Sequence, residues 1–260
     1  MMDQKHGLLP PSVPSGNELV TAESAAGREC KTQPILACWW ADVVCLFRSA
    51  KTLLISNRWK LLVFVLLGSA LIAWLMPQDL ILLAQVRHVG DSPESERIRS
   101  LARWLSYWGD VAGFNVLVFV TLAGLAFVRR SSFFRRLTIA AVLGTVLTGG
   151  VVNVIRVSTG RARPGSNLPP GFYGPSMSAR KQSFPSAHTA TSFGACVPLA
   201  VAFPPVGVPL LVVSGGVAWS RMQNNSHHPS DVLTSVLLSL VFGVPLGLAV
   251  RRKQHLTSNV

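Results

Sequence analysis

The stretch SFGACVPLAVAFPPVGVPLLVVSGGVAW, residues 192–219, contains no charged residue and no histidine. A membrane-spanning helix needs about 20 consecutive apolar residues, so this run predicts a segment inside a lipid bilayer. Pro204, Pro205 and Gly207 lie near its middle. Such a group is typical of a turn, because proline lacks the backbone N–H that a helix interior needs. We therefore predict two short spans joined by a turn rather than one long helix.

Further apolar segments recur on both sides of this stretch. Of the 260 residues, 49% are hydrophobic and 13% are charged, a balance that argues against a soluble domain. We predict an all-α fold, a polytopic membrane helical bundle with about six transmembrane helices. The expected spans are residues 60–77, 111–128, 137–155, 187–203, 206–220 and 231–250.

The remaining segments suggest the domain organisation. Residues 1–34 are polar with no apolar signal core and are expected to be a flexible cytoplasmic tail. Residues 35–58 combine the Trp39-Trp40 pair with basic residues, which favours an interfacial amphipathic segment, with an additional buried span as the alternative. The six-span domain then covers residues 59–253, and residues 254–260 form a second cytoplasmic tail.

Lysine and arginine in the short loops predict the orientation, because cytoplasmic loops carry an excess of both. Three basic groups fall on one side of the six-span arrangement. They are Arg48, Lys51, Arg58 and Lys60; Arg129, Arg130, Arg135 and Arg136; and Arg251, Arg252 and Lys253. We expect a multi-pass protein of the plasma (bacterial inner) membrane with both termini in the cytoplasm. Loops 78–110, 156–186 and 221–230 then lie on the periplasmic or extracellular face.

The charge distribution indicates the kind of partner. The formal net charge is +13, and beyond Asp110 the only carboxylate side chain is Asp231. The basic residues stand in short loops between apolar runs, which favours membrane lipids and phosphorylated lipids over nucleic acid. No nucleic-acid partner is expected, and the oligomeric state stays open.

Three short segments of the outer loops contain most of the remaining polar side chains. They are RVSTGRARP at 156–164, SFPSAHT at 183–189 and SRMQNNSHHPSD at 220–231. Arg156, Arg163 and Arg221 are candidates for phosphate binding, because guanidinium groups form paired, charge-assisted hydrogen bonds with phosphate oxygens. Ser186 precedes a predicted helix, whose free N–H groups favour an anion.

The histidines are the candidates for chemistry. His227 and Asp231 are four residues apart, so one helical turn places them on the same face, where the carboxylate can fix the tautomer of the imidazole. His188 offers a second imidazole for proton transfer, and His228 is interpreted as structural. Each residue also has an ordinary interpretation, as a membrane anchor, a helix cap or a dipole partner, and the combination favours a site.

A metal ion is not expected. Magnesium-dependent phosphatases need several carboxylates, and the second half of the chain has one. The four cysteines show no CxxC pair and no Cys/His zinc spacing, so they are interpreted as unpaired thiols. We therefore predict an enzyme without metal or other cofactor.

In combination, the three segments resemble the signature of the type 2 phosphatidic acid phosphatase superfamily, in its membrane-bound lipid phosphate phosphatase branch. That signature has Lys and Arg-Pro, then Pro-Ser-Gly-His, then Ser-Arg, His and Asp. The third segment matches it at Ser220, Arg221, His227 and Asp231. Two departures are Arg156 in place of Lys and Ala187 in place of Gly. Together with the six-span layout, the resemblance covers residues from about 60 to 250.

The resemblance implies a role for each matched residue. His227 would attack phosphorus to form a phosphohistidine, Asp231 would support it, and His188 would protonate the leaving alkoxide. The groups that would hold the phosphate oxygens are Arg156, Arg163, Ser186, the Ala187 amide and Arg221. If the glycine of the family needs a positive φ, Ala187 would introduce strain.

The predicted function is therefore hydrolysis of a lipid phosphomonoester or diphosphate taken from the bilayer. Phosphatidic acid, phosphatidylglycerol phosphate, undecaprenyl diphosphate and lipid A phosphates remain open as substrates. A lipid phosphotransferase would use the same residues. A non-catalytic protein that binds anionic lipid is the alternative from another class, and it gives no reason for the spacing of His227 and Asp231.

Overall fold

The protein is a bundle of helices. The structure, a computed structural model, describes residues 35–109 and 111–258, and the predicted tail at 1–34 lies outside them. The α-helices are α2 (Ile35–Ser56), α3 (Arg58–Leu75), α4 (Asp79–Val86), α5 (Pro93–Trp108), α6 (Val116–Val128), α7 (Ser132–Thr159), α8 (Ala187–Ala202), α9 (Pro204–Gln223) and α10 (Pro229–Ser258). Within the described ranges there is no strand, and Arg161 and Phe172 form an isolated bridge.

Several helices are long and apolar enough to cross a membrane. Among the described residues, three qualify alone, Arg58–Val86, Ser132–Thr159 and Pro229–Arg252, and the bent pair of α5 with residues 113–128 makes a fourth candidate. Helix α8 has 16 residues, fewer than a typical span of about 20. The six predicted spans coincide with α3, α6, α7, α8, α9 and α10 to within about five residues at each end, except that α10 continues to Ser258. The predicted all-α, multi-pass membrane fold is confirmed.

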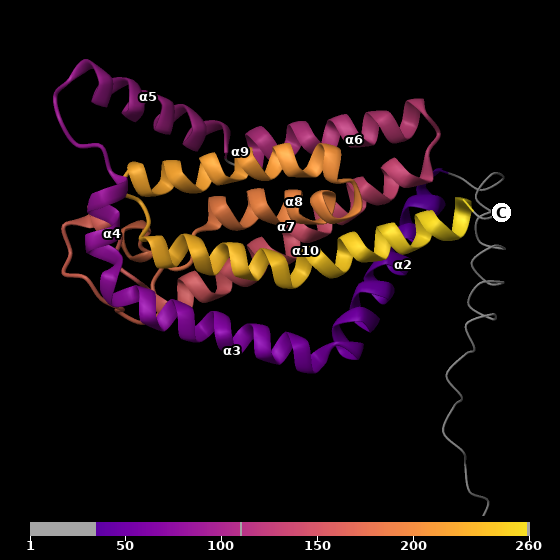
Figure 1. Cartoon of the computed structure of the whole chain (residues 1–260), viewed down its shortest axis with the longest axis horizontal. Coiled ribbons are helices and arrows are strands. Elements are labelled where there is room, and N and C mark those ends of the chain that lie inside the picture. Colours follow the sequence, from indigo (N-terminus) through magenta and orange to yellow (C-terminus); the bar gives the residue numbers. More distant parts are fainter. Residues whose placement is uncertain (1–34, 110, 259–260) are drawn as a thin grey trace, which may run out of the picture. The chain divides into compact units, whose positions relative to one another are not determined.

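The predicted turn in the long apolar stretch is present. Helix α8 ends at Ala202 and α9 begins at Pro204, where proline is tolerated because the first N–H groups of a helix have no partner within it. A Cβ atom on Gly207 would lie 2.0 Å from the Ala200 nitrogen, so only glycine permits α9 to start this close to the end of α8. The two helices run back along each other (Figure 1). The start of α8 and the end of α9 therefore lie at the same end of the bundle.

Helix α8 is the centre of the bundle and packs against α7, α9 and α10 (Figure 1). Its crossing with α7 is close, because a Cβ atom on Gly144 would lie 2.1 Å from the Gly194 carbonyl oxygen. Small residues at such crossings let helix backbones approach in a membrane, where packing replaces the hydrophobic effect as the driving force. This core fixes the start of α8 relative to the neighbouring loops.

Two helices lie in a segment that the sequence analysis treated as loop 78–110. Helix α4 continues from α3, and α5 is preceded by the N-cap residue Ser92, whose side chain accepts a hydrogen bond from the Ser95 N–H at 3.2 Å. Pro93 follows at the first helical position, a strong start signal. Helix α5 packs along α9 (Figure 1). The Asn224 side chain donates to the Ala102 carbonyl at 3.2 Å and fixes this contact.

The N-terminal helix α2 contributes a buried acid to the unit that starts at Asp42. Asp42 accepts hydrogen bonds from Arg135 Nε at 2.6 Å and Arg136 Nε at 3.0 Å, both at the start of α7. We call these three residues the Asp42 cluster. The interfacial position of residues 35–58 stays a prediction.

The cysteines differ in part from the expectation. Cys38 is disulfide-bonded, so its interpretation as an unpaired thiol was wrong. Cys45 and Cys196 are free, as expected.

Candidate active site

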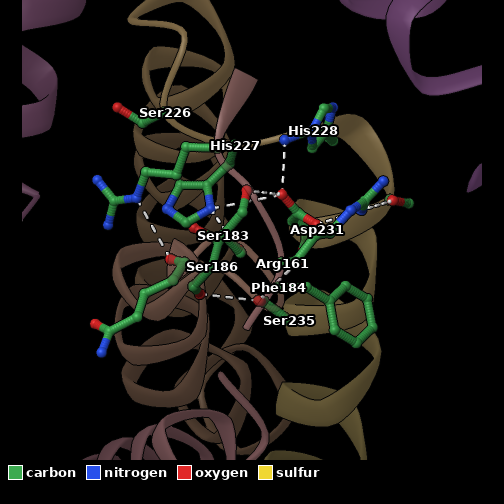
Figure 2. A network of polar contacts seen from close by, with 12 residues as sticks. Arg161, Ser183, Phe184, Ser186, Ser226, His227, His228, Asp231 and Ser235 are labelled. Atoms are coloured by element: carbon green, nitrogen blue, oxygen red, sulfur yellow. Dashed lines mark hydrogen bonds and ion pairs between the residues drawn. The ribbon is translucent and has the colours of Figure 1, made fainter. Parts of the chain in front are cut away.

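The three predicted segments meet at one end of the bundle. Ser183 and Ser186 come from the loop before α8, His227 from the loop after α9, and Asp231 from the first turn of α10 (Figure 2). All four residues are buried. The Ser186 N–H donates to the Asp231 carbonyl at 3.3 Å, which joins the start of α8 to the start of α10.

His227 is held in one tautomer. Its Nδ1 lies 2.7 Å from the Ser183 carbonyl oxygen. Because a carbonyl only accepts hydrogen bonds, Nδ1 carries the proton and Nε2 keeps a free lone pair. The spacing in the sequence predicted this role for Asp231, whose Oδ2 is 3.7 Å from Nδ1. A backbone carbonyl has replaced the predicted carboxylate as the closest partner.

The pKa of His227 also favours the neutral imidazole. The pKa is lowered from 6.5 to about 4, mainly by burial; Asp231 acts in the opposite direction, and the positive charges of Arg221 and Arg163 contribute to the lowering. His227 is therefore uncharged at neutral pH. A buried, neutral imidazole with a bare Nε2 is a competent nucleophile.

Asp231 is surrounded by donors. Its carboxylate accepts hydrogen bonds from Arg161 Nη1 at 2.5 Å, Ser183 Oγ at 2.5 Å and the His228 N–H at 2.8 Å (Figure 2). These contacts leave the carboxylate little freedom to rotate. Its negative charge stays beside His227, where it can stabilise an imidazole that becomes positive during a reaction.

Arg161 joins Asp231 to a second buried acid that the sequence analysis did not select. Its Nη2 lies 2.7 Å from Asp79 Oδ2, and the Ser230 N–H donates to Asp79 Oδ1 at 2.9 Å. The ring of Phe172 lies 5.4 Å from the Arg161 guanidinium carbon. We call Asp79, Arg161 and Asp231 the Asp231 cluster. Asp79 lies inside the candidate span Arg58–Val86, which is longer than the predicted span 60–77, and an acid inside a span is a functional signal in itself.

The structural interpretation of His228 stays a prediction. Burial lowers its pKa, and its backbone N–H bonds to Asp231. Its side chain therefore stays neutral next to the Asp231 cluster.

Ser186 occupies the N-cap position of α8 with an extended backbone. Its hydroxyl accepts from Thr189 Oγ1 at 3.0 Å and does not cap the helix. Ala187 is the first residue of α8 and is not among the residues with positive φ. The strain considered for alanine at this position is therefore absent.

Of the three predicted phosphate-binding arginines, Arg156 and Arg163 lie close enough for the charge of one to affect the other. Arg163 has its pKa lowered by burial and then by the charge of Arg156, and raised by Asp231. Arg156 Nη2 donates to Asn153 Oδ1 at 2.7 Å, and its buried Nε has no hydrogen-bond partner within the described residues. Arg221 donates to Ser106 of α5. Clustered, desolvated guanidinium groups are suited to bind an anion.

His188 stands in the first turn of α8 and lines a cavity of about 480 Å³. Arg221 of α9 and Arg103, Ser106, Tyr107 and Trp108 of α5 line the same cavity. The predicted second imidazole and one predicted phosphate ligand thus share one opening. In the part of the chain that the structure describes, no three His, Cys, Asp or Glu side chains gather as a metal site would require, and the predicted independence from cofactors stays a prediction.

Comparison with known proteins identifies the fold of this region. Residues 137–254, which contain all three segments, match the family model described as the PAP2 superfamily. This part of the chain belongs to the PAP2 superfamily. The resemblance found in the motifs is thereby confirmed for the PAP2 core, from α7 to α10.

Two further relatives agree with the PAP2 assignment. A lipid A 1-phosphatase of Porphyromonas gingivalis is 28% identical over 128 residues, which is 48% of this chain and 26% of that protein. The crystal structure of a PAP2-type phosphatidylglycerolphosphate phosphatase from Bacillus subtilis superposes with a TM-score of 0.51 at 17% identity, over 75% of this chain and 95% of that one. The second comparison supports the membrane PAP2 fold, and the first spans about a quarter of the curated relative.

Proposed function

We propose that the protein is a membrane-embedded lipid phosphate phosphatase that works through a phosphohistidine. One observation carries the proposal. The Ser183 carbonyl holds the proton of His227 on Nδ1 at 2.7 Å, which leaves the lone pair of Nε2 free, and the charges of Arg163 and Arg221 are close enough to lower the pKa of His227. A nucleophile thus adjoins a binding site for anions.

In the first step, His227 Nε2 would attack phosphorus. An N–P bond forms, the P–O bond to the lipid breaks, and His188 gives its proton to the leaving alkoxide. Arg156, Arg163 and Arg221 would hold the three equatorial oxygens, where the charge of the transition state gathers. The carboxylate of Asp231 would compensate the positive charge that the imidazole acquires.

In the second step, His188 would take a proton from water, whose oxygen attacks phosphorus. The N–P bond breaks, inorganic phosphate leaves, and His227 is neutral again. An acceptor hydroxyl from another lipid in place of water would give phosphotransfer, which the same residues support.

The substrate class follows from the surroundings of the site. The protein is embedded in the membrane, and the relatives that it resembles are phosphatases of lipid A and of phosphatidylglycerolphosphate. A phosphomonoester on a lipid is therefore the proposed substrate, with lipid A 1-phosphate and phosphatidylglycerol phosphate first in a panel with phosphatidic acid and undecaprenyl diphosphate.

The test is phosphate release from this panel by purified protein in detergent. His227→Ala is expected to abolish turnover while binding of a lipid phosphate persists, because the arginines remain. His228→Ala is the matched control and is expected to keep most of the activity. EDTA is expected to leave the rate unchanged. Near-normal turnover by folded His227→Ala protein, or loss in the His228 variant alone, would contradict the assignment.

We also propose that the site faces the periplasm. The clustered arginines at the start of α7 then lie in the cytoplasm, in keeping with the excess of positive charge there. Single cysteines at Ser176, Ser226 and Ser132, in protein lacking the four native cysteines, would be exposed to an impermeant thiol reagent in intact cells. Labelling is expected at 176 and 226 and not at 132. Opposite responses of 176 and 226 would refute both this sidedness and a shared site.

A further inference from the structure

A second cavity adjoins the polar cavity of about 480 Å³ that contains His188 and Arg221. It has a volume of about 300 Å³ and lies between α5, α6 and α9. Trp108 and Gly113 line both cavities. The other lining residues of the second cavity are Trp104, Leu105, Gly109, Phe114, Leu117, Val213 and Val217. None of them is charged, so a polar chamber and an apolar chamber share one wall.

The wall between the two chambers is held in place by close packing and hydrogen bonds between α5 and α9. The end of α5 approaches α9 so closely that a Cβ atom on Gly109 would lie 2.5 Å from the Val217 side chain. Next to it, Ser106 accepts the hydrogen bond of Arg221, and Asn224 bonds to the Ala102 carbonyl. These contacts tie α5 to the helix that carries Arg221.

The two chambers differ in chemistry as the two ends of a lipid do. Arg103, Arg221 and His188 line the first, with no carboxylate among its described lining residues. The second is lined by aliphatic and aromatic side chains. Trp108, which is half exposed, stands at the boundary, a position that suits an indole with one apolar and one wet side.

We propose that these chambers form the binding site for one lipid phosphate, with the headgroup in the polar chamber and an acyl chain in the apolar chamber between α6 and α9. The inference rests on the proposed function and adds the route and the recognition element. Helix α5 would then select substrates, because it supplies Arg103, Ser106, Tyr107 and Trp108 to the headgroup chamber.

A groove between α3 and α10 is the competing route. It has a volume of about 330 Å³ and includes Val65, Leu237 and Phe184. One of its lining residues is Phe184, whose ring lies 6.0 Å from the guanidinium carbon of Arg161. That side leads to the Asp231 cluster, and neither His188 nor Arg221 lines the groove. An acyl chain in this groove would place the phosphate of the lipid next to the Asp231 cluster and away from His188, the proposed second imidazole.

The experiment fills each route with the same substitution. Val213→Trp narrows the chamber between α6 and α9, and Val65→Trp is the matched control in the groove between α3 and α10. Both valines are partly exposed, so the larger ring can be accommodated in the folded protein. The probes are dioleoyl and dihexanoyl phosphatidic acid in detergent, with any lipid phosphate that the wild type prefers in the panel added in long- and short-chain forms.

The expected result is selective. Val213→Trp should lower kcat/KM for the long-chain lipid at least tenfold, because each methylene kept out of an apolar site costs about fourfold in binding. It should leave kcat/KM for the short-chain lipid within about twofold, and Val65→Trp should change neither. Equal effects of both variants, or a long-chain defect in Val65→Trp alone, would overturn the route. Wild-type protein without activity on any probe would instead refute the proposed function.

A second measurement does not depend on a bulky variant. A lipid phosphate with a photoreactive group on its acyl chain is bound to His227→Ala protein, which keeps the arginines, and is then irradiated. Crosslinks are expected in peptides around Leu117 and Val213. Crosslinks confined to peptides around Val65 and Leu237 would contradict the proposal.

Discussion

The two ends of α7 carry two clusters of arginine and buried carboxylate that are alike in composition and unlike in surroundings. The Asp42 cluster has one acid and two arginines at the start of the helix. The Asp231 cluster has two acids and one arginine just beyond its end. The first therefore has a formal charge of +1 and the second of −1.

The two clusters also differ in the groups that surround their carboxylates. Asp42 bonds to the two arginines, and that contact joins α2 to α7. Asp231 bonds to Arg161 and also to the Ser183 hydroxyl and the His228 N–H, and it lies 3.7 Å from His227. The ion pairs of the Asp42 cluster join two helices. The ion pairs of the Asp231 cluster also fix a charge beside a reactive imidazole, so their geometry affects chemistry as well as stability.

The largest expected difference between the clusters is in activity. Arg161→Gln is expected to lower kcat about 100-fold, because Asp231 loses the donor that orients it and a shift of about 1 Å in a site can have that effect. Arg136→Gln is the matched variant at the other end of α7. It is expected to leave kcat within about twofold, because Asp42 keeps its bond to Arg135. Phosphate release and KM would be measured for both.

Measurements of thermal stability distinguish a role of Arg161 in positioning Asp231 from a role in folding alone. Removal of Arg161 leaves two buried acids without their counter-charge, which typically costs about 3–5 kcal/mol. The double variant Asp79→Asn/Arg161→Gln removes one charge of each sign and is expected to regain thermal stability but not kcat. Full recovery of kcat in the double variant would mean that Arg161 has a structural role alone.

The sequence predicted the spans and the motif residues well because both depend on local patterns. The charge-free run with its Pro-Pro-x-Gly group predicted the two helices on either side of Phe203. The spacing of His227 and Asp231 predicted that they lie near each other, and they do. Helix α5 was missed although Ser92 and Pro93 are strong start signals, because its polar surface was interpreted as loop.

The rest of the site depends on contacts that residue types do not encode. The Ser183 carbonyl that fixes His227 is a backbone atom, and any residue at that position would supply it. The pairing of Asp79 with Arg161 joins residues 82 positions apart in the chain. Only the packing of α4 beside the start of α10 brings Asp79 and Ser230 together. Such contacts emerge from the fold as a whole.

The smallest and last expected effect concerns pH, to which the two clusters should respond differently because only the Asp231 cluster has His227 beside it in the described structure. Burial lowers the pKa of His227 from 6.5 to about 4, and the attacking form is the neutral one. The contribution of His227 to kcat/KM should therefore stay constant as the pH falls from 7 to about 5 and decline about tenfold per pH unit below 4. Because the unfolded chain takes up this proton at a higher pH than the folded one, stability should also decrease as the pH falls from 6.5 to about 4.

A charge variant shows whether His227 causes the fall of kcat/KM at low pH, which we call the acid limb. The positive charge of Arg221 contributes to the low pKa of His227, so Arg221→Gln should move the limb to higher pH, whatever its effect on the absolute rate. Arg136→Gln, in the Asp42 cluster at the other end of α7, should leave the limb in place. Rates measured from pH 3.5 to 7, with the ionisation of the substrate phosphate determined separately, provide the comparison. A limb that stays fixed in the Arg221 variant would assign the titration to another group and would leave His227 without kinetic support as the nucleophile.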